Sequence, residues 1–582
     1  YNQYLVHLNG GNVMSTNISK QKRDALLDKI NQIKNYISAA PQDENTANLL
    51  TYIGELTKEI NGKKYGLVFE EHREKIDELL EENAPVLVEQ EDLFIDNGGE
   101  MNFLIEGDNL AALKLLEKTH KGKIDVIYID PPYNRGTKAN KDFMYDDCYI
   151  DDTDEYKHSK WISFISKRLE IAKKLLSQDG IMFISIDEHE VENLKLLCNE
   201  LFGEKNTEFL IWRKNGKQGN TKKILRFKNT HEYIIACYMN REEKHLGKCK
   251  LFPNWKNEYP NSDNDPRGSY KAGNISLMEE KSDPESPNFY TITTPTGKQY
   301  TREWFISKEE FERLDNDKVE NSDGKLLGRI YYPNNGDGVP ALKIFKSEEQ
   351  YYYFDSIIDE MGTFTDAKNE LIPLFNNRDA FDTPKPVKLI QEIIRISQPD
   401  LKNTQSSTIL DFFAGSGTTG HAVMKLNAED GGNRKFILCT NNENNICQDV
   451  TYQRLKTVIT GKRKDGSDYD ENYKASLKYF KIDYLPIKDK MYYEYADELL
   501  EHVKELVELE NAIDFNTNKS VAIVLDDDEL AEFVENIADY PECKTLYMGH
   551  DVLTSYQQEQ TIKAHGITIN TVPDYYYRDL AN

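Results

Sequence analysis

The 582-residue chain lacks features expected of a membrane or secreted protein. It contains no apolar run of about 20 residues, so no membrane-spanning helix is expected. Residues 1–13 lack the basic and apolar segments of a signal peptide, and Met14 could be the natural start, with the preceding residues a leader. Its seven cysteines stand singly, without a C-x-x-C pair, which argues against a zinc site. We therefore expect reduced, mostly buried thiols in a cytoplasmic protein.

The chain also lacks an excess of positive charge: its 73 lysines and arginines are outnumbered by 100 aspartates and glutamates, which gives a formal net charge of −27. This argues against a protein that coats nucleic acid without specificity, since phosphate contacts need clustered lysine and arginine. One stretch, residues 213–231, has no acidic residue and contains Arg213, Lys214, Lys217, Lys222, Lys223, Arg226 and Lys228. Glycines and asparagines interrupt it, which predicts a loop that could either follow a phosphate backbone or be an ordinary solvated charge run.

Strands and helices alternate over two parts of the chain. Short apolar strands are predicted at 103–105, 124–129 and 180–186, with helices at 110–116 and 161–176, the second ended by Asp179-Gly180. The alternation stops from about 205 to 380 and resumes with a helix at 387–396 and strands at 408–413 and 436–438. This pattern predicts an α/β fold, with a parallel sheet covered by helices on both faces.

Asp130-Pro131-Pro132-Tyr133 directly follows the predicted strand at 124–129. Ligands of open parallel sheets bind at this strand edge. The Asp130 carboxylate and the Pro131 carbonyl could accept the two hydrogens of an aromatic amine and so make its nitrogen nucleophilic. Tyr133 offers a flat face for an extruded base. An ordinary strand exit with an acid and two prolines is the alternative.

The second motif runs from Asp411 to Gly420, with sequence DFFAGSGTTG, and follows the strand predicted at 408–413. Its glycines let a ligand approach the backbone at the start of a helix. The spacing also matches G-x-G-x-x-G, so a nicotinamide or flavin cofactor must be considered. However, Asp411 would repel a pyrophosphate and suits the cationic ammonium of a methionyl group.

The two motifs, in this order, resemble the β-class of amino-methyltransferases, and among them the modification (Mod) subunit of type III restriction-modification systems. The similarity extends to Leu104–Leu110, Gly180–Asp187, Leu201–Glu204, His231–Tyr233, Phe381–Pro386 and Val450–Tyr452. It implies a Rossmann-like, S-adenosylmethionine-dependent enzyme that flips adenine out of DNA and methylates N6. Aspartate rather than serine at position 130 resembles the adenine-specific members.

The apolar pattern and the resemblance together imply a domain order. We expect a helical N-terminal region at 1–90, a first part of the methyltransferase core at 91–204, and an inserted target-recognition domain at 205–380. The second part of the core would span 381–485, and a small α/β domain at 486–582 would contact a partner. The expected partners are double-stranded DNA, a second copy of the chain and a helicase-nuclease (Res) subunit.

Site residues are carried over to matching positions of this chain. Asp130 to Tyr133 would be catalytic. Asp108 would accept from the cofactor's adenine amine, Glu443 would meet its ribose, and Thr383 and Lys385 would hold its carboxylate. Glu443 stands later than the family pattern places this acid, and a solvated loop glutamate is the alternative. The remaining cofactor contacts would be Asp411, Phe413, Ala414, Gly415 and Gly417.

DNA contacts are expected from two basic segments. The first follows the catalytic motif and carries Arg135 and Lys138, which could close over the flipped nucleotide. The second is the basic stretch described above, with Arg213, Lys214, Lys217, Lys222, Lys223 and Arg226. No metal is required.

Several alternatives stay open. The chain could be a solitary DNA adenine methyltransferase without a nuclease partner, or it could act on RNA or protein. An NAD-type oxidoreductase and a non-enzymatic DNA reader are further possibilities. The methyltransferase hypothesis requires that the turns near residues 130 and 415 lie together in one cleft.

Overall fold

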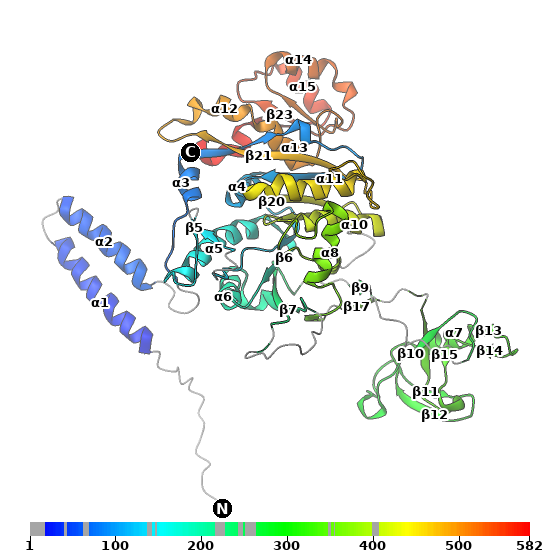
Figure 1. The fold of residues 1–582 in the computed structure, drawn as a ribbon. Helices are drawn as coiled ribbons and strands as arrows, with labels where there is room; N and C mark the ends of the chain where they lie inside the picture. Colours follow the sequence, from blue (N-terminus) through cyan, green and yellow to red (C-terminus); the bar gives the residue numbers. More distant parts are fainter. Residues whose placement is uncertain are drawn as a thin grey trace, which may run out of the picture.

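The computed structural model describes residues 18–39, 44–61, 69–136, 142–145, 148–215, 227, 229–242, 248–250, 263–346, 348, 351–353, 355–397 and 407–581. Its main body is a ten-stranded sheet in the order β1-β21-β2-β20-β19-β3-β6-β8-β7-β18 (Figure 1). The predicted α/β fold class is therefore confirmed. Within the described part of the chain, none of the helices has the length and apolar character needed to cross a membrane.

The six central strands are mutually parallel. They are β21 (Ser476–Pro486), β2 (Met101–Glu106), β20 (Lys435–Thr440), β19 (Thr408–Asp411), β3 (Ile124–Ile129) and β6 (Leu176–Ile186). Strand β1 (Asn83–Glu89) pairs antiparallel with β21 at one edge. At the other edge, β8 (Glu232–Tyr238) and β7 (Thr207–Trp212) continue the sheet antiparallel, and β18 (Ile357–Ile358) pairs parallel with β7.

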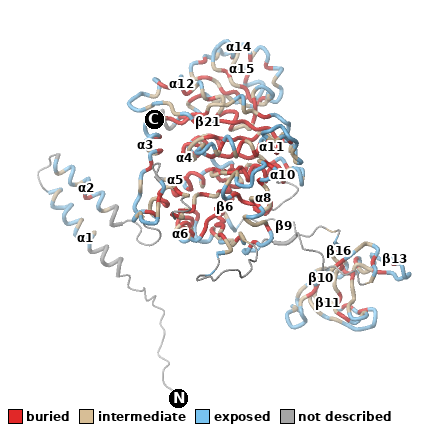
Figure 2. The backbone as a smooth tube through the Cα atoms, viewed as in Figure 1, coloured by how far each residue is buried: buried red, intermediate tan, exposed pale blue. Residues whose placement is uncertain are grey.

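Helices cover both faces of this sheet. Successive strand residues point to opposite sides, and apolar residues stand on both, so both faces are packed against helices. Ile127 and Ile129 of β3 face one core, which α4 (Asn109–Thr119), α5 (Lys157–Leu175) and α6 (Val191–Phe202) complete. Val126 and Tyr128 face the other. That core is completed by α8 (Phe364–Phe375), α9 (Val387–Ile396), α10 (Thr418–Asp430) and α11 (Gln453–Thr460). Figure 2 shows the buried residues concentrated through this body.

Five of the cysteines agree with the expectation of buried thiols: Cys198, Cys237, Cys439, Cys447 and Cys543 are free and buried. The side chains of Cys148 and Cys249 lie outside the described set.

The sheet extends further along the chain than the sequence pattern indicated. Strands β7, β8 and β18 belong to the main sheet, and α8 to its cover, although all four fall within the expected insertion at 205–380. Similarly, Asp179-Gly180 lies inside β6, not in a loop after a helix. The reason in both cases is pairing with neighbouring strands, which overrides the local turn and polarity signals.

A separate small unit lies between β8 and β18 in the chain and beside the main body in Figure 1. It contains the sheet β10 (Tyr270–Asn274), β16 (Ala341–Phe345) and β15 (Ile330–Tyr331), the hairpin β11 (Phe289–Thr293) and β12 (Gln299–Glu303), the pair β13 (Val319–Glu320) and β14 (Leu326–Leu327), and helix α7 (Lys308–Asn316). Trp304 and Phe311 centre its own core. A strand pair, β9 (Lys248–Lys250) and β17 (Tyr351–Tyr353), lies between this unit and the body.

Two further units flank the body. At the N-terminal side, α1 (Ile18–Ala39) and α2 (Glu44–Asn61) form a hairpin that stands apart in Figure 1, followed by α3 (Lys75–Glu82). At the C-terminal side, α12 (Ala496–Leu500) and α13 (Val503–Asn511) lead into a parallel three-stranded sheet of β22 (Val521–Val524), β23 (Thr545–Gly549) and β24 (Thr568–Val572). Helices α14 (Asp527–Glu535), α15 (Tyr556–Ala564) and α16 (Asp574–Ala581) complete this unit.

Candidate active site

The two motifs lie side by side because their strands are neighbours. Strands β19 and β3 pair in parallel, with Ile409 opposite Val126 and Leu410 opposite Ile127. Asp130 directly follows β3, and Asp411 is the last residue of β19. Both carboxylates therefore stand at adjacent strand ends, on the sheet edge where parallel α/β folds bind ligands.

The backbone of the first motif is held by three side chains. The Trp161 indole of α5 donates to the Pro132 carbonyl at 2.7 Å, and the Tyr133 amide donates to Asp142 at 2.9 Å. Asn134 follows with φ +60 and is buried. Its amide donates to Glu190 at 2.5 Å, which holds this left-handed turn in place.

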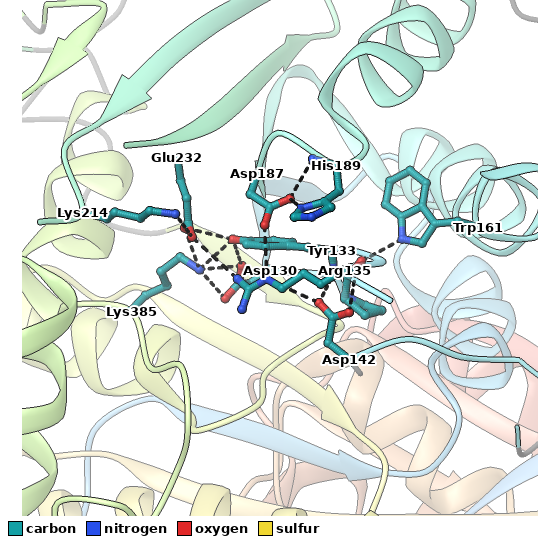
Figure 3. Close-up of polar contacts among 11 residues, drawn as sticks. Asp130, Tyr133, Arg135, Asp142, Trp161, Asp187, His189, Lys214, Glu232 and Lys385 are labelled. Carbon is teal, nitrogen blue, oxygen red and sulfur yellow. Dashed lines mark hydrogen bonds and ion pairs between the residues drawn. The ribbon is translucent and has the colours of Figure 1, made fainter. Parts of the chain in front are cut away.

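Tyr133 is 4% exposed and ties the motif to its surroundings. Its hydroxyl donates to Asp130 at 2.6 Å, and the Arg135 guanidinium lies 5.0 Å from its ring centre (Figure 3). Burial, followed by the negative charges of Asp130 and Glu232, raises the pKa of Tyr133 well above its usual range. The phenol is therefore neutral and acts as a donor to Asp130. Its use as a stacking platform stays a prediction.

The second motif forms a tight turn into α10. Gly415 and Gly417 have φ values of +48 and +74, which other residues adopt at a cost. A Cβ at Gly415 would lie 3.1 Å from the Phe381 ring, and one at Gly417 would lie 3.3 Å from Thr451. Both the conformation and the close packing therefore require glycine here.

Asp411 is 3% exposed and accepts two hydrogen bonds. The Phe413 amide donates to one oxygen at 3.0 Å, and the Thr419 hydroxyl donates to the other at 2.6 Å. Burial nevertheless raises the pKa of Asp411 to about 7, because the two bonds offset only part of the desolvation. A buried carboxyl of this kind gains most from a cationic ligand group.

Both motifs line one cavity of about 580 Å³. Its lining includes Asp130, Pro131, Pro132, Tyr133, Thr383, Lys385, Asp411, Phe413, Ala414 and Gly415. A second cavity of about 770 Å³ contains Asp108, Arg168 and Glu443. The two adjoin, since both are lined by Pro132, Asp142, Phe413, Asn444 and Ile446. Of the thirteen residues assigned to catalysis or cofactor binding, ten line the first cavity. Two more, Asp108 and Glu443, line the second. The remaining one, Gly417, supports the turn through its conformation.

Asp108 and Lys385 already have protein partners. Asp108 caps α4 by accepting from the Leu110 amide at 2.7 Å, and its side chain is 36% exposed toward the second cavity. Lys385 was expected beside the cofactor's carboxylate. Its ammonium instead donates to both oxygens of Asp130, at 2.7 and 2.6 Å. Its assigned role in cofactor binding stays a prediction.

The predicted DNA contacts fall into two groups. Lys138, Lys217, Lys222, Lys223 and Arg226 lie outside the described residues. Arg135, Lys214 and Arg213 are described, and each pairs with a carboxylate: Arg135 with Asp187 at 3.1 Å, Lys214 with Glu232 at 3.4 Å, and Arg213 with Asp359. Arg135 and Lys214 therefore serve the charge balance of the site in this structure.

Sequence reasoning missed two buried ionic residues that support the site. Arg454 is fully buried under the glycine turn and donates to the Thr418 hydroxyl at 2.9 Å and to Ser416 at 3.3 Å. Glu232, at the start of β8, is also fully buried, and one of its oxygens lies 3.2 Å from the Tyr133 hydroxyl. Glu232 stands in the His231–Tyr233 segment noted for its resemblance, which was the one available signal; nothing local distinguishes Arg454.

Comparisons with known proteins agree with this architecture. A family model described as DNA methylase matches residues 124–452, more than half of the chain. The StyLTI Mod subunit of Salmonella typhimurium, a type III restriction-modification enzyme, is 30% identical over 392 residues, covering 62% of this chain and 56% of that protein. The EcoPI Mod subunit of Escherichia phage P1 is also 30% identical, over 60% of this chain and 58% of that protein.

A type II methyltransferase is similarly related. M.KpnI of Klebsiella pneumoniae is 30% identical over 405 residues, which cover 65% of this chain and 89% of that protein. By contrast, this chain spans a little over half the length of the two Mod subunits it matches. The matched region contains both motifs and the strands that bring them together, and the chain belongs to the DNA methylase family.

Proposed function

We propose that this chain transfers the methyl group of S-adenosylmethionine to N6 of adenine in double-stranded DNA. The observation that carries the proposal is the opening of Asp130 and Asp411 into one cavity from adjacent strand ends. The first carboxylate suits an aromatic amine, and the second suits a cationic donor. Methyl transfer between two positioned ligands needs little more than orientation and electrostatics from the protein.

The residues of the site fit this cofactor. S-adenosylmethionine, when bound, supplies an electrophilic methyl group on a sulfonium. The buried Asp411 carboxyl, with its pKa of about 7, would face the cationic methionyl end, and Gly415 lines the same cavity. Asp108 and Glu443 line the adjoining cavity, where the adenosine end would lie.

Asp130 and the Pro131 carbonyl would accept the two hydrogens of the target amine and direct its lone pair toward the methyl group. The Trp161 bond to the Pro132 carbonyl and the Tyr133 bond to Asp130 keep these acceptors in place. Closure around a flipped base would exclude water, and the surplus proton of the product would pass to solvent. Aspartate at position 130 is the feature that favours adenine over cytosine N4.

The direct test uses unmethylated genomic DNA and S-adenosylmethionine labelled in its methyl group, followed by digestion to nucleosides. We expect the label in N6-methyldeoxyadenosine, no transfer by Asp130→Ala, and little competition from added RNA. Label in N4-methyldeoxycytidine would refute the adenine assignment, and preferential labelling of RNA would refute the DNA assignment.

We further propose that the chain is the modification and specificity subunit of a type III restriction-modification system, forms a homodimer and joins a Res helicase-nuclease subunit. The similarity to two Mod subunits supports this. The match to 89% of M.KpnI favours a second candidate, a solitary methyltransferase. Co-purification of a helicase-nuclease with the chain from its host, and the solution mass of the purified protein, separate the two; a chain isolated without such a subunit would favour the solitary enzyme.

A further inference from the structure

The acceptor that the target amine needs is already occupied by an ammonium group of the protein. Lys385 donates to both Asp130 oxygens, and the Tyr133 hydroxyl donates to one of them at 2.6 Å. A carboxylate accepts about four hydrogen bonds, two on each oxygen. Lys385 and Tyr133 fill one Asp130 oxygen, and Lys385 takes one position on the other. An incoming amine must therefore share that second oxygen with Lys385 or displace it.

A second carboxylate lies within reach of the same ammonium. The Lys385 Nζ is 3.5 Å from the Glu232 carboxylate, and both groups are buried, with side chains 4% and 0% exposed. Charge-assisted hydrogen bonds have lengths of about 2.7–2.9 Å, so a shift of about 0.6–0.8 Å would turn this ion pair into a direct bond. Figure 3 shows Lys385 between the two carboxylates.

Other groups prepare Glu232 for this role. One of its oxygens lies 3.2 Å from the Tyr133 hydroxyl, and the other lies 3.4 Å from the Lys214 ammonium and 3.9 Å from Arg135. Arg135 is itself oriented by Asp187 at 3.1 Å. Glu232 is fully buried and the Asp130 side chain is 23% exposed, so this pair of carboxylates needs compensating charge in every state of the site. A move of Lys385 from one carboxylate to the other keeps its positive charge between them.

We propose that Lys385 is an exchangeable counterion of Asp130, and that Glu232 is the positioning residue to which its ammonium shifts when the target amine takes its place. The inference rests on the proposed methyl transfer to an amine. No proton or covalent bond changes hands in this exchange. When no nucleobase is bound, Lys385 neutralises Asp130. When the target nucleobase enters, Lys385 pairs with Glu232, and an oxygen of Asp130 becomes free to accept from the amine.

The test compares Glu232→Gln with the double variant Glu232→Gln/Lys385→Met, in single turnovers on unmethylated genomic DNA with saturating cofactor. Glu232→Gln should slow methyl transfer about 30-fold, because Lys385 loses its alternative anion and stays on Asp130. The double variant should be about 10-fold faster than Glu232→Gln, since no ammonium then blocks Asp130. Cofactor affinity should change less than twofold in both.

The matched control is Glu208→Gln, a neutralisation on the adjacent strand β7, where Glu208 pairs with Arg241 at the surface. It should transfer at the wild-type rate. The faster transfer of the double variant is a readout that a purely structural role of Glu232 would not give, because the loss of a second residue of the site would then slow transfer further.

The outcomes separate the two proposals. If wild-type protein transfers a methyl group but the double variant is no faster than Glu232→Gln, the exchange is refuted and the proposed function stands. Transfer by Glu232→Gln at the wild-type rate refutes the exchange as well. If wild-type protein methylates no DNA, the proposed function fails, and the exchange falls with it.

Discussion

Replacing Asp411 by asparagine should make the protein more stable and its cofactor binding weaker. The substitution keeps the shape of the side chain. An asparagine oxygen can still accept from the Phe413 amide, and its amide can donate to the Thr419 hydroxyl, replacing the two bonds of the carboxyl. The change therefore removes a buried charge with little loss of hydrogen bonding.

The magnitude follows from the pKa of Asp411, which burial raises from 3.8 to about 7. At about 1.4 kcal/mol per pH unit, the ionised carboxylate costs up to about 4 kcal/mol in the folded state. The folded protein retains a proton that the unfolded chain releases between pH 3.8 and 7, so stability falls as pH rises through this window. Asp411→Asn cannot ionise and so does not lose this stability. Its free energy of unfolding should exceed that of the wild type by about 4 kcal/mol above pH 7, and the difference should vanish toward pH 4.

Cofactor binding should show the opposite effect. A cationic ligand prefers the ionised carboxyl, so the wild-type affinity for S-adenosylmethionine should fall up to about tenfold for each pH unit below 7. Asp411→Asn should bind more weakly above pH 7 and lack this dependence. Urea unfolding and titration calorimetry between pH 5 and 8 measure both quantities, with exposed Asp551→Asn as the control. Wild-type affinity that is independent of pH, together with unchanged affinity in Asp411→Asn, would refute the reasoning.

Three further substitutions test the supports of the site. Asp130→Asn should lower methyl transfer at least about 100-fold with unchanged cofactor affinity, because one acceptor for the amine is lost; equal loss of cofactor binding would contradict its assigned role. Trp161→Phe removes the bond to the Pro132 carbonyl and should lower the free energy of unfolding by about 1–2 kcal/mol, measured by urea denaturation. Arg454→Met leaves the Ser416 and Thr418 hydroxyls without their donor and should cost about 3 kcal/mol by the same assay while weakening cofactor binding. Wild-type stability in either of the last two variants would show that these bonds contribute nothing.

The parts of the fold that sequence predicts well are those with a local signal. Strands β3, β19 and β20 and the second half of β6, residues 181–186, are mostly apolar segments. Parallel strands expose their carboxyl ends on one edge, so the meeting of Asp130 and Asp411 follows from topology once the sheet is assumed. Their immediate adjacency depends on the strand order, which required the structure.

The edge of the sheet was harder to predict. Strand β7 is half exposed and β8 follows it antiparallel, so neither belongs to a strand–helix alternation. Their place in the sheet comes from pairing with β6, a long-range contact with no local pattern. Glu232 was overlooked for the same reason, since its importance arises only when β8 brings it against Tyr133.

Charge near the catalytic motif shows a similar limit. Lys385 and Asp130 are 255 positions apart in the sequence, and a lysine at a turn usually points to solvent. Arg135 and Lys214 likewise stand in basic segments, which suggested contact with phosphate, yet both face buried carboxylates. Composition can indicate that a segment is basic, but the partners of each cation depend on the tertiary fold.

A structure of the protein with S-adenosylmethionine and a duplex containing its target site tests the central claim most directly. We expect the sulfonium methyl group between the Asp130 and Gly415 turns, with the amine of an everted adenine about 3–3.5 Å from it and hydrogen-bonded to Asp130. A cofactor bound elsewhere, or an adenine amine remote from Asp130, would contradict the account.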